Sequence, residues 1–294
     1  DQVTYCWGYN GGGQLGNNGS AASYVPVPVA AGSLTFVSIS ASVGFFAEST
    51  TCAVTDDGAG YCWGSNGFGN AGISEQVTTT IRAPLAVGGG LTFRSIRPGT
   101  DHTCGLTTED QAYCWGRGIY LGTGDFSQES SYLPVAVAGG LDFQDLDAGD
   151  EIACGVTSAG AAYCWGSNDY GQLGDGTLSS RAAPTLVEGD HTFESVSVSA
   201  RPSHACALTL GGDAYCWGSN DVGQLGNGDV PDGALVPSQV VGALTFESVS
   251  AGSFHTCAVT LGGGAYCWGH NVQGTLGDGD APNNSDVPVP VATP

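Results

Sequence analysis

Short runs of alternating polar and apolar residues, separated by turns rich in glycine, cover the whole chain. One unit contains the segments FESVS, HTCAVT and AYCWG, and a fourth segment, VPVPV, follows after a glycine-rich loop. Successive side chains of a strand point to opposite faces, so this alternation indicates strands rather than helices. The sequence therefore predicts four short β-strands in this unit, at residues 246–250, 255–260, 265–269 and 287–291.

The unit repeats with a period of about 50 residues. The tetrapeptide Tyr-Cys-Trp-Gly occurs six times in 294 residues, and successive tryptophans are 50 to 56 residues apart. These tryptophans are Trp7, Trp63, Trp115, Trp165, Trp217 and Trp268. A repeat of this length with four strands is typical of a β-propeller, in which each period forms one blade. We predict an all-β fold, a single propeller domain over residues 1–294 with six or seven four-stranded blades.

Ten of the eleven cysteines form pairs that are ten residues apart. The pairs are Cys52 with Cys62, Cys104 with Cys114, Cys154 with Cys164, Cys206 with Cys216, and Cys257 with Cys267. Folding each intervening segment into a hairpin places the two cysteines opposite each other on one face, within reach of a disulfide. We therefore predict one disulfide in each of five blades, each stabilising the fold by roughly 2–3 kcal/mol.

The same hairpins leave a loop of three residues. Its last residue is Gly58, Asp110, Gly160, Gly212 or Gly263. This is the left-handed position of a three-residue β-hairpin, where glycine has no steric penalty and aspartate is tolerated. Zinc is a competing interpretation of the cysteines, but the chain has no Cys-x-x-Cys pair, and a ten-residue gap does not match zinc ligand spacing.

The strand at residues 265–269 has two different faces, because Tyr266 and Trp268 point to one side and Cys267 to the other. Stacked blades should then hold the disulfide of one sheet against the tyrosine and tryptophan of its neighbour. A unit of about 50 residues cannot bury both faces alone, so the core is expected to lie between the sheets.

Composition restricts the partners and the compartment. Six arginines and no lysine stand against 28 acidic residues, giving a formal net charge of −22, which repels nucleic acids and anionic membrane surfaces. No run of eighteen apolar residues exists, so membrane insertion is not expected. Persistent disulfides require an oxidising compartment, which indicates an extracellular or cell-surface protein. Asn18 and Asn283 begin acceptor triplets for an N-linked glycan.

These repeats resemble those of the regulator of chromosome condensation family. The matching signature is a turn of small residues before His-Thr-x-Ala-Leu/Val-Thr, then Trp-Gly-x-Asn-x-x-Gly-Gln-Leu-Gly, seen best at residues 165–174 and 217–226. The resemblance covers essentially the whole chain. It implies a propeller of six or seven blades that presents loops and is not an enzyme in itself. The paired cysteines resemble the disulfide-bonded versions found in secreted and cell-surface proteins.

Members of that family also exchange nucleotides on a small GTPase, sense ultraviolet light through clustered tryptophans, or inhibit a β-lactamase. The six tryptophans here all occupy the same position of the repeat, where packing between blades is a sufficient explanation. The catalytic surface and basic tail of the nuclear exchange factor have no visible counterpart. We therefore expect neither photoreception nor nucleotide exchange.

No convergent group of residues for catalysis stands out from the periodic background, so neither enzyme activity nor a cofactor is expected. His102, His204 and His255 each precede a cysteine by two residues. They should therefore occupy equivalent strand positions, and we predict a structural hydrogen bond for each.

A weak calcium candidate lies near the end of the chain, where Asp278, Asp280 and Asp286 supply oxygen ligands. Their spacing does not fit an EF-hand loop. The alternative is a turn-rich connector in which aspartate and asparagine side chains accept hydrogen bonds from local backbone donors.

Two units depart from the common length. The separation from phenylalanine to cysteine is 11 residues in three units, but 13 from Phe193 to Cys206 and 16 from Phe36 to Cys52. Both insertions fall in the same inter-strand loop and should emerge on one face. The candidate interaction residues in them are Val43, Phe45, Phe46, Arg201 and Pro202. The two phenylalanines either pack beneath their own turn or contact a partner.

The sequence thus predicts a non-catalytic extracellular propeller that serves as a protein-binding, adhesion or assembly module, with a protein partner or self-association. One alternative is a structural subunit of an extracellular filament or larger surface protein. Another is an inhibitor of a secreted enzyme.

The first unit is incomplete, because Cys6 lies too near Asp1 for a partner ten residues earlier. We expect the chain to be a segment of a longer one. The missing part would be an upstream strand pair of roughly 20 residues bearing the Cys6 partner for six blades, and a further blade for seven.

Overall fold

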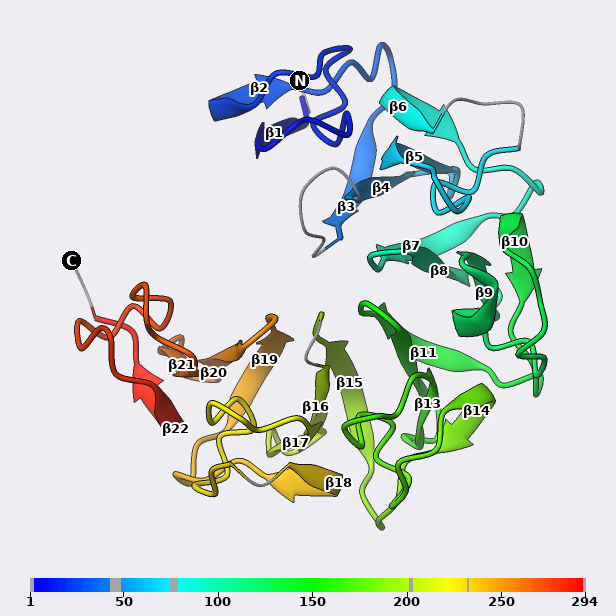
Figure 1. Ribbon diagram of the computed structural model, residues 1–294. Coiled ribbons are helices and arrows are strands. Elements are labelled where there is room, and N and C mark those ends of the chain that lie inside the picture. The colour runs from blue at the N-terminus through cyan, green and yellow to red at the C-terminus, as the bar shows by residue number, and fades with distance from the viewer. Residues whose placement is uncertain (1–2, 43–48, 75–78, 201–202, 232, 293–294) are drawn as a thin grey trace. The chain divides into compact units, whose positions relative to one another are not determined.

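The computed structural model describes residues 3–42, 49–74, 79–200, 203–231 and 233–292. These residues form 22 β-strands and the short 3-10 helix η2 (Gly118–Tyr120). The strands make one two-stranded sheet and five four-stranded sheets, each built from strands that are consecutive along the chain (Figure 1). The predicted all-β architecture of four-stranded propeller blades is confirmed.

The chain divides into two compact units. The first comprises Asp1–Asp142 and Ala148–Glu151, and the second comprises Phe143–Asp147 and Ile152–Pro294. The sheets of the first unit contain β1 (Tyr5–Gly8) and β2 (Ser23–Pro28); β3 (Phe36–Ala41), β4 (Thr50–Thr55), β5 (Gly60–Ser65) and β6 (Thr80–Ala86); and β7 (Phe93–Pro98), β8 (His102–Thr107), β9 (Ala112–Gly116) and β10 (Ser131–Ala136).

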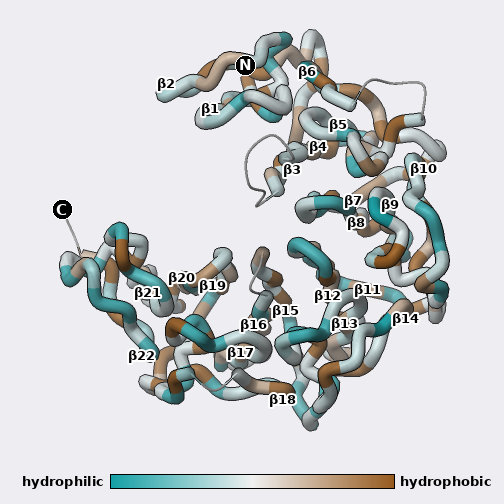
Figure 2. The backbone as a smooth tube through the Cα atoms, viewed as in Figure 1, coloured by the Kyte–Doolittle hydropathy of each residue, from teal (hydrophilic) through white to brown (hydrophobic). Residues whose placement is uncertain are grey.

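The second unit holds three four-stranded sheets. They contain β11 (Phe143–Ala148), β12 (Ile152–Thr157), β13 (Ala162–Gly166) and β14 (Arg181–Leu186); β15 (Phe193–Val198), β16 (His204–Thr209), β17 (Ala214–Gly218) and β18 (Ala234–Gln239); and β19 (Phe246–Ala251), β20 (His255–Thr260), β21 (Ala265–Gly269) and β22 (Ser285–Pro290). Hydrophobic residues occur in short stretches throughout the sheets rather than in one long run (Figure 2).

The predicted strands of the last unit agree closely with the structure. Strands β20 and β21 have the predicted bounds, and β19 continues one residue further, to Ala251. Strand β22 begins two residues earlier than predicted because Ser285 lies opposite Gly269 of β21 and so joins the ladder. The alternating pattern therefore located the strands to within two residues.

The glycine of each Tyr-Cys-Trp-Gly strand allows an irregularity that the pattern alone did not explain. The register between the third and fourth strands shifts at this point, for example between Cys216 and Gly218. Gly218 has φ +101°, and a Cβ atom there would lie 2.7 Å from the Ser203 carbonyl oxygen. A side chain at this position is therefore excluded both by backbone conformation and by close approach of the neighbouring strand.

The five predicted disulfides are present, each between cysteines directly opposite each other on the second and third strands of a sheet. The Cα atoms of each pair are 4.1 Å apart, as expected for a non-hydrogen-bonded pair. The last hairpin residue is left-handed in every case, with φ between +63° at Asp110 and +84° at Gly58. The hairpin and disulfide predictions are thus confirmed, and Cys6 is the free cysteine.

Alkylation of the native, unreduced protein should therefore modify one cysteine per chain, Cys6. The other ten are held in disulfides and cannot react until they are reduced. Intact-mass spectrometry after iodoacetamide treatment, followed by peptide mapping, measures this directly. The same treatment after reduction in denaturant is the control and should modify all eleven. Five or more modified cysteines in the native protein would contradict the assignment.

Candidate interaction surfaces

The core lies between neighbouring sheets, where the disulfide of one sheet packs with the tryptophan of the next. Cys206 and Cys216 of the fourth complete unit share one buried cluster with Phe246 and Trp268 of the following sheet. In the other junctions described, the disulfide Cys52–Cys62 shares a cluster with Trp115, and Cys154–Cys164 with Trp217. This confirms the face assignment made from the alternation of side chains.

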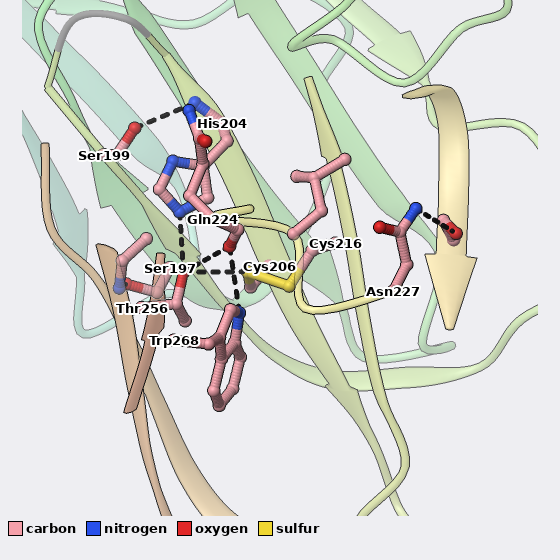
Figure 3. Close-up of a disulfide and its surroundings, with 12 residues drawn as sticks. Ser197, Ser199, His204, Cys206, Cys216, Gln224, Asn227, Thr256 and Trp268 are labelled. Atoms are coloured by element: carbon pink, nitrogen blue, oxygen red, sulfur yellow. Dashed lines mark hydrogen bonds between the residues drawn. A yellow bond between two sulfur atoms is a disulfide. The ribbon is translucent and has the colours of Figure 1, made fainter. Parts of the chain in front are cut away.

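A hydrogen bond to the preceding sheet fixes four of the five buried indoles, whereas Trp165 Nε1 has no partner among the described residues. Trp268 Nε1 donates to the backbone carbonyl oxygen of Gln224 in the preceding sheet at 2.9 Å, and the Thr256 hydroxyl donates to the same oxygen at 2.9 Å (Figure 3). The same pair of bonds recurs twice. Trp63 and Thr51 donate to the Gln14 carbonyl, and Trp115 and Thr103 donate to the Asn70 carbonyl. Trp217 donates to the Gln172 carbonyl. A buried N–H without an acceptor is costly, so in these four cases the loop of one sheet completes the next one.

A buried asparagine holds that loop in shape. Asn220 Oδ1 accepts the backbone N–H of Leu225 at 3.0 Å, and its Nδ2 donates to Asn227 Oδ1 at 3.2 Å. The side chain of Gln224 accepts the N–H of Val222 at 3.0 Å. The segment Trp-Gly-x-Asn-x-x-Gly-Gln-Leu-Gly is therefore a structural signature, since its polar side chains bind its own backbone and its backbone binds the next tryptophan.

The glycine-rich loop that follows β5 departs from this scheme. Seven residues after Asn220 lies Asn227, which accepts a hydrogen bond from it, but seven residues after Asn66 lies the apolar Ile73. Among the described residues, Asn66 Nδ2 therefore has no acceptor. Asn70 replaces the usual glutamine and is one methylene shorter; its Nδ2 donates to the Thr50 hydroxyl at 2.6 Å. This loop precedes residues 75–78, which lie outside the described part of the chain.

The three histidines occupy equivalent positions at the start of β8, β16 and β20, as predicted. His204 Nε2 lies 2.8 Å from the Thr256 hydroxyl, which confirms a structural hydrogen bond for that residue (Figure 3). For His102 the prediction is not confirmed, because neither ring nitrogen makes a hydrogen bond of good geometry among the described residues, although the backbone of Asp150 lies near enough to raise its pKa.

Burial keeps these imidazoles neutral. Burial lowers the pKa of His204 to about 3, and the neighbouring His255 contributes to that change. Burial also lowers the pKa of His102 to about 4, although the nearby backbone carbonyl of Asp150 opposes it. Two fully enclosed, neutral rings are not placed to exchange protons with a substrate in solution.

The calcium candidates hold their own loop together. The Asp278 carboxylate accepts hydrogen bonds from Asn271 Nδ2 and from the backbone N–H of Asp280, both at 3.0 Å, and the latter bond lowers the Asp278 pKa. Asp280 Oδ1 accepts from Asn283 Nδ2 at 3.2 Å, and Asp286 lies in β22. Within the described residues, no group of three or more His, Cys, Asp or Glu side chains is placed to hold a metal ion.

The candidate interaction residues Val43, Phe45, Phe46, Arg201 and Pro202 lie outside the described residues. The strand bounds show that both insertions connect the first and second strands of their sheets, β3 to β4 and β15 to β16. The prediction that they lengthen the same inter-strand loop is therefore confirmed. Their emergence on one face stays a prediction.

A serine closes the base of each lengthened loop. The Ser42 hydroxyl accepts the backbone N–H of Thr50 at 2.9 Å, and the Ser199 hydroxyl accepts that of His204 at 2.8 Å. In the short loops a glycine occupies the corresponding turn, as where Gly252 N–H donates to the His255 carbonyl. The strands are thus joined at the loop base whatever the length of the segment beyond it.

An aromatic surface that the sequence did not predict lies on the first sheet. Trp7 is 63% exposed, whereas the other five tryptophans of the repeat are fully buried. Tyr5, Cys6, Trp7 and Tyr9 line a cavity of about 320 Å³ together with residues of the next sheet, including Ile39. The incomplete first repeat was the available signal for this surface, because it leaves Trp7 without a complete sheet around it.

Two further features bear on the partners. The acceptor residues Asn18 and Asn283 are both exposed. In the part of the chain that the structure describes, no helix has the length and apolar character needed to cross a membrane.

Comparisons with known proteins agree with this geometry. The family model described as the RCC1-like domain matches residues 1–294. The ultraviolet-B receptor UVR8 of Arabidopsis thaliana is 30% identical over 287 residues, which cover 94% of this chain and 63% of that receptor. A protein RCC2 homolog of Xenopus laevis is 36% identical over 99 residues, covering 33% of this chain and 18% of that protein. The chain thus spans less than two thirds of the length of these relatives.

Solved structures show the same fold. The crystal structure of Kap60 bound to yeast RCC1 (Prp20) matches with a TM-score of 0.83 and 22% identity, covering 99% of this chain and 71% of that one. The CRINKLY WD40 ectodomain of the Arabidopsis thaliana receptor kinase ACR4 matches with a TM-score of 0.53 and 22% identity, covering 81% and 71%. At this level of identity, the similarity concerns the fold alone.

A glycine substitution in the loop after β17 should be more destabilising where the glycine contacts Trp268 than where it contacts nothing. Gly226 has φ +67°, and a Cβ atom there would lie 2.6 Å from Trp268 Nε1; Gly228 has φ +81° and no heavy atom within 4 Å. Gly228→Ala should cost about 1 kcal/mol of unfolding free energy through backbone strain. Gly226→Ala should cost about 1–3 kcal/mol more through the steric conflict with the indole. Equal losses in denaturant unfolding would contradict this junction geometry.

The buried histidines should make the protein less stable in acid. Their folded-state pKa values, about 4 and about 3, lie below the ordinary value of 6.5. Between these values the unfolded chain binds protons that the folded protein does not, so this contribution is complete above about pH 6.5 and is lost as the pH falls towards 4. The wild type should lose stability between pH 6.5 and pH 4, and His102→Leu should remove about 3 kcal/mol of that loss in the free energy of unfolding. Unfolding curves at several pH values measure the difference. Parallel profiles for variant and wild type would refute it.

Proposed function

Because the chain belongs to the RCC1-like domain family, we propose that it is a non-catalytic, protein-binding propeller that acts outside the cell. The observation that carries the proposal is the lengthening of one inter-strand loop in two repeat units. Insertions in repeat proteins map to exposed loops, which often form the binding face. The serine hydrogen bonds at the base of these loops join the two strands without any contribution from the inserted residues.

Disulfides and charge support the extracellular assignment and the kind of partner. Five disulfides persist only where the surroundings are oxidising. The formal net charge of −22 favours a protein partner over a nucleic acid or an anionic membrane. Exposed Asn18 and Asn283 are accessible for glycosylation, and the ACR4 chain of the same fold is the ectodomain of a receptor kinase.

The tryptophans support a binding role rather than light sensing, although UVR8 is a relative. Each buried tryptophan contacts a phenylalanine of its own sheet, with ring centroids 5.8 to 6.2 Å apart. Four of them donate their indole N–H to a loop carbonyl. These contacts account for the tryptophans through packing, so no photochemical role is proposed.

The experiment changes the larger loop and leaves the scaffold intact. The double substitution Phe45→Ser and Phe46→Ser should reduce partner binding or assembly at least about tenfold, with the melting temperature unchanged, if the rings contact a partner. Affinity capture from extracellular protein fractions and light scattering measure binding and assembly, and thermal unfolding measures the fold. Leu261→Ser is the matched control, since Leu261 is an exposed apolar residue at a hairpin tip and its loss should affect neither.

A clear loss of thermal stability with unchanged association would show that the two phenylalanines pack beneath their own turn. The proposal would then fail for this loop. Capture of one secreted enzyme together with loss of its activity would identify the inhibitor role, and regular self-assembly would identify the structural one.

A further inference from the structure

The hairpin between β8 and β9 differs from the hairpins at the same position of the other four-stranded sheets. Its tip reads Thr-Glu-Asp-Gln at residues 108–111, whereas the others read DDGA, SAGA, LGGD and LGGG at residues 56–59, 158–161, 210–213 and 261–264. Glu109 and Gln111 thus stand where the other units have smaller side chains. A three-residue hairpin requires only its left-handed residue, here Asp110, so hairpin geometry does not account for these two larger side chains.

A small polar cavity adjoins this hairpin. It measures about 180 Å³, and all of its lining residues fall between Gly90 and Tyr113, in the first compact unit. This volume lies below the range of roughly 300–1,000 Å³ that is usual for drug-sized ligands, so the cavity suits a single small ring. The turn before β7 contributes Leu91 and Thr92, the hairpin contributes Thr108, Glu109 and Gln111, and β9 contributes Tyr113.

Hydrogen bonds hold the walls of the cavity in place. The hydroxyls of Thr92 and Thr108 lie 2.8 Å apart and share a hydrogen bond, and the Thr108 backbone N–H donates to the Thr92 carbonyl at 3.1 Å. These bonds join the turn before β7 to the hairpin. Gln111 Nε2 donates to Asp142 Oδ1 at 2.5 Å, which fixes the amide and gives its oxygen the role of acceptor. The polar groups of the cavity are therefore arranged before any ligand arrives.

The charge of the lining excludes an anionic ligand. Of the described residues that line the cavity, Glu109 is the charged one. Arg94 of β7 is paired with Asp110 at 2.9 Å and does not line the cavity. The Glu109 carboxylate and the Gln111 amide oxygen are acceptors, whereas the threonine and tyrosine hydroxyls both donate and accept. The matching ligand is rich in hydrogen-bond donors and carries no negative charge.

Two classes of ligand have this property, neutral sugars and protonated amines. An ammonium group is best held by several carboxylates or by an aromatic cage, and this cavity has one carboxylate and one aromatic ring. A sugar ring has hydroxyls around its rim and a face of C–H groups. Three threonine hydroxyls, an amide and a carboxylate suit the rim, and the apolar surfaces of Leu91 and Tyr113 suit the C–H face. The lining therefore favours the neutral sugar.

We propose that this cavity binds a neutral sugar as one pyranose ring, either free or at the end of a glycan. The Glu109 carboxylate accepts hydrogen bonds from two adjacent hydroxyls, the Gln111 amide oxygen accepts from a third, and Tyr113 contacts the C–H face of the ring. The connection from β7 to β8 and the hairpin from β8 to β9 leave opposite ends of β8. The sugar site thus lies at the other end of the strands from the type of loop that carries the two insertions, and it adds a second role to the proposed protein binding.

The test is an NMR titration of the unreduced, isotope-labelled chain with the methyl glycosides of glucose, galactose, mannose, fucose and N-acetylglucosamine. At millimolar concentrations, at least one glycoside should shift the amide signals of residues 90–92 and 107–113 and leave the other four hairpins unchanged. An oligosaccharide that ends in the same sugar then distinguishes the two sources. Tighter binding than that of the methyl glycoside indicates the end of a glycan, and weaker binding indicates the free sugar.

A pair of variants assigns the binding to this cavity. Glu109→Ala should weaken the affinity for the sugar at least about tenfold, because it removes the charged acceptor. The hairpin tolerates alanine there, since the next unit has Ala159 at the same position, so the melting temperature should not change. The matched control is Asp213→Ala in the hairpin between β16 and β17, which removes the same charge and should leave the affinity unchanged.

The proposal would be overturned if no glycoside of the panel shifted the signals of residues 90–92 and 107–113. Equal affinities of wild type and Glu109→Ala for the sugar would overturn it as well. Butylammonium is the probe for the competing class. If it bound the cavity more tightly than every glycoside, with an affinity that falls as salt is added, the site would be assigned to a cation instead. Substitution of Phe45 and Phe46 should leave sugar binding unchanged, so the two proposals fail separately.

Discussion

The hydrogen bond from a buried indole N–H to a loop carbonyl of the preceding sheet is the constraint on which the packing of four sheets against their predecessors depends. Trp268 and Thr256 share the Gln224 carbonyl, and the same arrangement recurs at Gln14 and Asn70. The bond requires the loop to approach the indole closely, which in turn requires glycine at positions such as Gly226. It also requires a rigid loop, which the buried asparagine provides. One directional contact therefore explains most of the repeated residues.

Much of this architecture could be predicted from sequence, because the interactions are local and repeated. The disulfides, the left-handed hairpin residues and the division of each strand into a cysteine face and an aromatic face follow from spacing and alternation alone. The carbonyl acceptor of the tryptophan could not be predicted in this way. It comes from a backbone atom about 45 residues away, and no residue type specifies it.

The candidate interaction surfaces were less accessible to prediction. The two insertions were correctly assigned to one inter-strand connection, since length differences within a repeat are visible in the sequence. Whether Phe45 and Phe46 pack inward depends on tertiary contacts that periodicity does not encode. His102 shows the same difficulty, because equivalent positions suggested equivalent hydrogen bonds, yet His102 does not share the threonine contact of His204. Repetition thus predicts the framework well and the individual departures from it poorly.

The short span of each disulfide has a consequence for oxidative folding. Partner cysteines are ten residues apart, whereas consecutive pairs are separated by about 40 residues, as from Cys62 to Cys104. Loop-closure entropy alone favours the nearer encounter by roughly tenfold, before any strand has formed. Each hairpin can therefore oxidise correctly as soon as both of its cysteines enter an oxidising compartment. Eleven thiols would otherwise offer many wrong combinations, and this spacing removes most of the need for disulfide reshuffling.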